Sequence, residues 1–144
     1  MNSFSIEKEI TINASPEIVF DMLTNSEQII RYYPLNEVIS EWKVGSNVLY
    51  KGEIDNKKFT DYGVIEIISR PTQYKYTYWS DNHGTENTPE NQITISYNLT
   101  NIKNATRLEL KQTNLRSKEM FEIMDSTVWP YLLDSMKNYI EKNT

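Results

Sequence analysis

The sequence contains no cysteine, one histidine and only four glycines among 144 residues. Without cysteine, disulfides and thiolate metal sites are excluded, and the composition fits a reducing compartment. A single histidine, His83, argues against a transition-metal site, because zinc normally takes His and Cys ligands. No glycine-rich phosphate loop follows a strand, and no Gly-x-Ser-x-Gly elbow occurs. We therefore expect no metal, no cofactor and no catalytic residue.

Long hydrophobic runs and an excess of positive charge are also missing. No apolar run approaches the ~20 residues that a membrane helix needs, and the first residues do not form a signal peptide. The formal charge is -5, with both signs dispersed along the chain, whereas nucleic-acid binding normally shows a basic stripe. We expect a soluble, cytoplasmic protein, monomer or homodimer, that neither inserts into a membrane nor binds nucleic acid.

Apolar and aromatic residues are abundant enough for a core. Hydrophobic residues make up 38% of the chain and aromatic residues 12%, with ten tyrosines against four phenylalanines. A chain of this length is typical of one domain, so we assign residues 1–144 to a single domain. Tyrosine combines a large apolar body with a hydroxyl that needs a partner when it is buried. A tyrosine-rich interior is therefore amphipathic.

The N-terminal third changes from a strand period to a helix period. Residues 4–13 alternate between apolar and polar, with Lys8 as the one break on the apolar face. Ser15 is a good N-cap and Pro16 suits the first helical position, which predicts a helix with Ile18 and Val19 on its apolar side. A second short helix is expected after residue 26, up to Tyr33 and the following proline.

From residue 37 to residue 115 the pattern predicts six strands separated by turns. They cover residues 38–42, 48–53, 59–69, 74–80, 92–100 and 106–115, which is typical of an antiparallel meander. The segment 81–89 is rich in Asn, Thr and Gly, so we expect an exposed loop with His83 in solvent.

Residues from Ser117 onward predict one long helix. Its apolar stripe consists of Phe121, Met124, Val128, Leu132, Met136 and Tyr139, widened by Leu133 and Ile140. Pro130 lacks an amide hydrogen, so we expect a kink or break near residues 127–129. The order is therefore a strand, two helices, six strands and a long helix. It predicts an α+β fold in which a curved antiparallel sheet wraps around the last helix, leaving a gap at one end.

Five segments in this order resemble a known family. They are residues 12–24 (INASPEIVFDMLT), 42–46 (WKVGS), 63–79 with GVIEI, Pro71 and YKYTYW, 106–110 (TRLEL) and 129–137 (WPYLLDSMK). The sequence resembles the SRPBCC (START-like, pollen-allergen-like) superfamily, in the branch similar to the C-terminal domain of the activator of heat-shock protein 90 ATPase. Ser46 and Val128 stand where that family usually has glycine. The resemblance implies a helix-grip fold with a pocket for a small apolar ligand, and it transfers no catalytic signature.

The candidate ligand-binding residues come from inward strand positions and from the helices beside them. Tyr50, Tyr74, Tyr76 and Tyr78 share inward parity and could either line a pocket or fill a core. The full set of candidates is Tyr32, Tyr33, Val48, Tyr50, Ile65, Tyr76, Tyr78, Gln112, Phe121 and Trp129.

Asp61 and Gln112 are polar residues at inward positions. Because an unpaired buried carboxylate is costly, Asp61 must be paired, neutral or at the pocket mouth, and a solvated strand end is the favoured reading.

Three functions remain open. The leading hypothesis is non-catalytic binding of a small hydrophobic or amphipathic molecule in the pocket. The alternative is an interaction module that modulates a chaperone such as heat-shock protein 90. The resembled activator uses an additional N-terminal domain for this, and these 144 residues leave no room for one. A cyclase- or hydrolase-like enzyme is the third possibility, although no nucleophile–base pair is evident.

Overall fold

The computed structural model describes residues 3–144 and contains one antiparallel sheet in the order β1-β7-β6-β5-β4-β3-β2. The strands are β1 (Phe4–Ile12), β2 (Glu37–Ser40), β3 (Asn47–Ile54), β4 (Lys57–Ser69), β5 (Gln73–Ser80), β6 (Ile93–Ile102) and β7 (Ala105–Leu115). The helices are α1 (Pro16–Leu23), α2 (Ser26–Tyr32), the 3₁₀ turn η1 (Pro89–Asn91), α3 (Lys118–Ile123), the π-helical turn η2 (Met124–Val128) and α4 (Trp129–Lys142). The predicted order of elements and the α+β helix-grip fold are confirmed.

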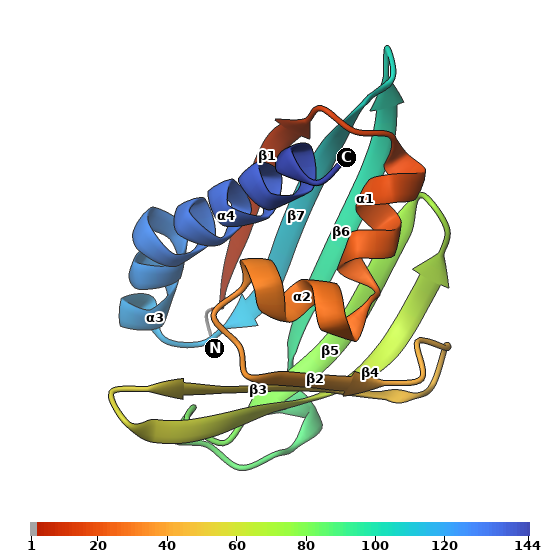
Figure 1. Ribbon diagram of the computed structural model, residues 1–144. Helices are drawn as coiled ribbons and strands as arrows, with labels where there is room; N and C mark the ends of the chain where they lie inside the picture. Colours follow the sequence, from red (N-terminus) through yellow and green to blue (C-terminus); the bar gives the residue numbers. More distant parts are fainter. Residues whose placement is uncertain (1–2) are drawn as a thin grey trace.

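The sheet curves around α4, and the two short helices lie on the same side of it (Figure 1). Consecutive strands β2 to β7 pair as neighbours, and β1 closes the other edge by pairing with β7. All the helices therefore cover one face, where the apolar core gathers between them and the sheet. The hydroxyl of Tyr139 on α4 donates to Gln28 Oε1 on α2 at 2.6 Å, which holds these helices together.

Side-chain caps mark the starts of α1, α2 and α3, and the cap predicted at Ser15 is confirmed. Ser15 Oγ accepts a hydrogen bond from the Ile18 amide, and Ser117 Oγ accepts one from the Met120 amide. Asn25 Oδ1 likewise accepts from the first amides of α2. These side chains satisfy amides that have no partner inside the helix. The caps therefore determine the residue at which each of the helices α1, α2 and α3 begins.

Lys8, the polar residue on the apolar face of β1, forms an ion pair with Asp125 of the π-helical turn. Its Nζ lies 3.1 Å from Asp125 Oδ1 in the π-helical turn, and both side chains are partly exposed. The one polar residue on this strand face therefore connects β1 to the irregular part of the last helix.

The last helix is interrupted beside Pro130, as expected, but the interruption is a π-helical turn. The Trp129 amide donates to the Met124 carbonyl, five residues back, and Pro130 follows near the start of α4. A π turn adds one residue to the helix, which rotates the following face by about 100°. The π turn thus accommodates, within a few residues, the backbone hydrogen bond that Pro130 cannot donate.

The predicted apolar stripe is confirmed in α4 at Leu133, Met136 and Ile140 and is less buried than expected at two positions. The buried residues of α4 are Trp129, Leu133, Met136 and Ile140, whereas Leu132 and Tyr139 are only partly buried. Leu132 and Tyr139 therefore lie at the edge of the buried face of α4.

In the part of the chain that the structure describes, no helix has both the length and the apolar composition required to cross a membrane.

Candidate functional site

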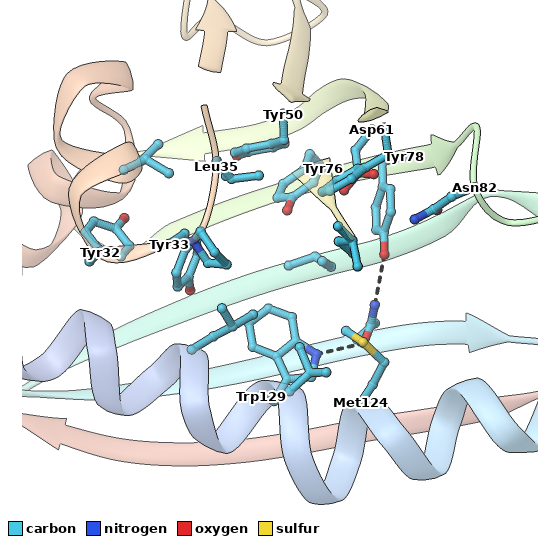
Figure 2. Close-up of a pocket in the computed structure, with 18 of the residues that line it drawn as sticks. Tyr32, Tyr33, Leu35, Tyr50, Asp61, Tyr76, Tyr78, Asn82, Met124 and Trp129 are labelled. Atoms are coloured by element: carbon cyan, nitrogen blue, oxygen red, sulfur yellow. Dashed lines mark hydrogen bonds between the residues drawn. The ribbon is translucent and has the colours of Figure 1, made fainter. Parts of the chain in front are cut away.

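A cavity of about 300 Å³ lies between the sheet and the last helix. This volume is at the lower end of the usual range for small-molecule pockets. The sheet contributes inward residues of β3 to β7, and the opposite wall comes from α2, residues 33–35 and the segment from α3 to α4 (Figure 2). The walls are mostly apolar and aromatic, including Ile29, Leu35, Ile95, Met124 and Leu132.

Seven of the ten candidate residues line this cavity. They are Tyr32, Tyr33, Tyr50, Tyr76, Tyr78, Gln112 and Trp129. They come from α2 and the residue after it, from the three strands β3, β5 and β7, and from the start of α4. The structure thus brings together residues that are almost one hundred positions apart in the chain.

Val48, Ile65 and Phe121 do not line the cavity. Val48 and Ile65 are on the inward face as expected, but both are fully buried within the packed core. Val48 lies over Gly63, where an added Cβ would come within 2.8 Å of Val48 Cγ1. Phe121 instead stacks on Phe4, with 5.0 Å between the ring centroids. Alternation predicts the face of a residue, but it does not predict whether open space or another side chain lies against it.

Most tyrosine hydroxyls around the cavity are paired. The Tyr50 and Tyr74 hydroxyls lie 2.8 Å apart, and those of Tyr33 and Tyr97 lie 3.0 Å apart. Burial raises the pKa of Tyr33 and Tyr50 well above the usual value for tyrosine. These phenols therefore stay neutral at physiological pH and act as hydrogen-bonding groups.

Tyr76 is the exception among these wall tyrosines. It lines the cavity, its ring packs against Tyr50 and Tyr74, and no other described residue forms a hydrogen bond with its hydroxyl. Burial is the main cause that raises its pKa well above the usual value. The Tyr76 hydroxyl is therefore a neutral donor and acceptor left available to the cavity.

A buried relay joins α4 to the sheet at the other side of the cavity. Trp129 Nε1 donates to Gln112 Oε1 at 2.8 Å, and Gln112 Nε2 donates to the Tyr78 hydroxyl at 3.1 Å (Figure 2). Gln112 is completely buried. Its amide has a partner at each end, so it fixes the position of two wall residues at once.

Asp61 and His83 lie at the loop end of the cavity, which corrects the expectation that both are solvated. Asp61 is only partly exposed and lines the cavity beside Tyr76 and Tyr78 (Figure 2). The Asp61 pKa is raised to about 6. Burial is the main cause, a hydrogen bond from Ser80 opposes it, and the nearby Asp81 adds to the rise.

The loop after β5 folds back over the sheet and carries His83 with it. His83 Nδ1 accepts from the Ser80 amide at 3.3 Å, and its ring centroid lies 5.7 Å from that of Tyr78. Burial lowers the His83 pKa, although Asp81 opposes this effect. Loop composition alone does not predict this placement, but the tight turn from residue 80 to residue 83 is its local cause.

Sequence reasoning also missed other wall residues. Strand alternation predicts that Tyr74, Ile95 and Tyr97 point inward, and the helical period includes Met120, Met124 and Leu132. None of these six is among the predicted ligand-binding residues, although all of them line the cavity. No sequence pattern predicts the remaining edge of the cavity, because it depends on how far the sheet curls. The residues there are Leu23, Pro34, Leu35, Glu53, Ile54 and Phe59.

The cavity lining has a limited set of reactive side chains. Its described lining contains no serine, threonine, cysteine or lysine, so no hydroxyl, thiol or amine nucleophile of these types faces His83. Among residues 3–144, no three or more His, Cys, Asp or Glu side chains are grouped to hold a metal ion.

Solved structures with the same fold cover nearly the whole chain. ChR145 from Cytophaga hutchinsonii is 28% identical, with a TM-score of 0.82 over 97% of this chain and 95% of that chain. The Aha1 dimer from Colwellia psychrerythraea is 21% identical, with a TM-score of 0.75 over 96% of each chain. MLL2253 from Mesorhizobium loti is 15% identical, with a TM-score of 0.80 over 98% of this chain and 99% of that chain. No curated protein shows significant similarity to the sequence.

The family comparison agrees with this fold. The model described as Activator of Hsp90 ATPase homolog 1-like protein matches residues 13–141. That match extends from the end of β1 into the last turn of α4. The chain therefore belongs to the Activator of Hsp90 ATPase homolog 1-like family, within the SRPBCC superfamily.

Proposed function

We propose that this protein binds one small hydrophobic or amphipathic molecule in the cavity between the sheet and the last helix, without catalysing a reaction. The cavity itself is the observation that carries the proposal, because packed cores rarely leave space for more than a water molecule. Its aromatic walls suit an apolar body, and the Tyr76 hydroxyl offers a hydrogen bond that no other described residue uses.

The fold positions this wall without help from a ligand. The Trp129–Gln112–Tyr78 relay and the Tyr50–Tyr74 pair hold the rings in place by hydrogen bonds. A preformed cavity avoids part of the ordering cost of binding. Binding removes apolar surface from water, so it should show a negative heat-capacity change.

Titration with a fluorescent apolar probe tests the proposal. The wild-type protein should bind the probe saturably, and Tyr76→Ala should change the affinity by about threefold or more, the equivalent of one ordinary hydrogen bond. Thr77→Ala is the matched control, because Thr77 is the next residue of β5 and points to the other face of the sheet. If the probe shows no saturable binding to the folded protein, the proposed function fails.

The alternative is a protein-interaction module, and the outer face of the sheet carries an observation in its favour. Ile39, Leu49, Tyr62 and Trp79 occupy successive register positions across β2 to β5, and Tyr62 stacks on Trp79 with ring centroids 6.0 Å apart. Binding of purified heat-shock protein 90 that Tyr62→Ser abolishes and Tyr76→Ala leaves unchanged would support this alternative.

A further inference from the structure

The charges that line the cavity are of one sign. Its described lining includes Asp61, His83 and, as an exposed residue at the edge, Glu53, but no lysine or arginine. The His83 pKa is lowered by burial, so this imidazole is neutral at pH 7 and above. An anionic ligand beside Asp61 would therefore meet a carboxylate and no compensating cation of the lining, whereas a cationic ligand would be attracted to it.

Asp61 has no cationic partner within the described part of the protein. Gln112 has a neutral partner at each end of its amide, whereas Asp61 takes part in none of the ion pairs among residues 3–144. The nearby Ser80 hydroxyl also donates to Asn82 Oδ1 at 2.7 Å, so it is shared. A half-buried carboxylate without a cation is unfavourable, and a positively charged group placed next to it would relieve that cost.

Aromatic rings surround the position of this carboxylate. Asp61 lies opposite Tyr50 and Ser80 in the register of its two neighbouring strands, and beside Tyr76 and Tyr78 (Figure 2). The faces of aromatic rings attract ammonium groups, and the attraction is larger where water is excluded. A carboxylate among tyrosine rings is therefore complementary to an alkylammonium group in both charge and hydrogen bonding.

We infer that the ligand of this cavity is an amphipathic amine, with its ammonium group beside Asp61 and its apolar body against the wall formed by α3 to α4. This inference rests on the proposed function and adds the charge of the ligand to it.

Competition with three ligands of equal chain length tests the charge preference. Decylamine, decanol and decanoate are titrated against the bound apolar probe at pH 8, below their micelle-forming concentrations. Decylamine should bind about tenfold or more tightly than decanoate, in line with a charged hydrogen bond. Asp61→Asn should weaken decylamine by about tenfold, change decanol by less than about twofold and strengthen decanoate.

Glu66→Gln is the matched control for the loss of one negative charge. Glu66 is on the same strand but exposed, where it pairs with Lys75, so this variant should leave all three affinities within about twofold. If Asp61→Asn leaves decylamine binding unchanged, or decanoate binds as tightly as decylamine, the charge inference is wrong while the small-molecule proposal stands. If none of the three ligands nor the probe binds, the proposed function itself is wrong.

Discussion

Gln112 and Asp61 are the two polar side chains that the strand pattern places on the inner face, and the structure treats them differently. Gln112 is completely buried and uses both ends of its amide, to Tyr78 and to Trp129. Asp61 lies at the loop end of the cavity, is partly exposed and has no cationic partner among residues 3–144. A satisfied polar group stabilises the fold, whereas an open one is available for a ligand.

The last helix repeats this contrast with two apolar neighbours. Leu133 is 2% exposed in the packed core, whereas the preceding Leu132 is partly buried and lines the cavity. Gln112 and Leu133 are therefore positions where partners or packing are complete, whereas Asp61 and Leu132 are positions left open to the cavity. Substitutions at the complete positions should mainly change stability, and those at the open positions should mainly change binding.

The largest effect on stability is expected for Leu133→Ala. Removing a leucine side chain from a filled core costs about 2–5 kcal/mol of unfolding free energy, since lost burial and a new void both contribute. Leu132→Ala should cost less than about 2 kcal/mol, because its side chain already faces open space. Urea unfolding of both variants checks this. Equal losses would mean that the cavity side of α4 is as tightly packed as the core side.

Gln112→Leu should lower the unfolding free energy by about 2–4 kcal/mol. The leucine leaves the Tyr78 hydroxyl and the Trp129 N–H without their buried partner, and each such group costs about 1–3 kcal/mol. Lys111→Gln, the adjacent exposed position of β7, is the control and should change stability by less than about 0.5 kcal/mol. A Gln112 variant as stable as the control would show that the relay does not hold the cavity wall.

Asp61→Asn should have a smaller effect that depends on pH. The folded pKa of Asp61 is raised from 3.8 to about 6 by burial, so the folded state binds the proton more tightly than the unfolded state. The wild type therefore loses stability as pH rises from about 4 to about 6, by at most about 3 kcal/mol. The asparagine variant cannot lose a proton at this position, so its advantage over the wild type should grow across that window and then level off.

Denaturation at pH 3.5, 5 and 7.5 measures this difference. The groups that could also titrate near Asp61 are Asp81, His83 and Glu53, and they are present in both proteins, so the comparison isolates Asp61. A constant difference between the two proteins at all three pH values would mean that the Asp61 carboxyl is fully solvated.

The order of elements was predictable because local rules decide it. Period-two and period-3.6 patterns, capping residues such as Ser15 and turn residues between strands specify all seven strands and the helices without knowledge of long-range contacts. The inward placement of Tyr50, Tyr76 and Tyr78 followed from the same alternation.

The cavity was less predictable because its shape depends on long-range geometry. Phe121 precedes the π-helical turn and stacks on Phe4 instead of lining the wall, and the turn leaves Leu132 partly buried at the cavity. The loop after β5 folded back and placed His83 against Tyr78, although its composition is that of a solvated loop. Curvature of the sheet decides which inward side chains face space, and no local pattern encodes it.

Intermolecular nuclear Overhauser effects between decylamine and methyl-labelled protein test the central claim most directly. The rival location is the outer face of the sheet, where Ile39 and Val64 are each 43% exposed. The account predicts one-to-one saturation, with contacts from the decyl chain to the methyl groups of Met124 and Leu132 and none to those of Ile39 and Val64. Contacts to Ile39 and Val64 without contacts to Met124 and Leu132 would contradict it, because the ligand would then lie outside the cavity.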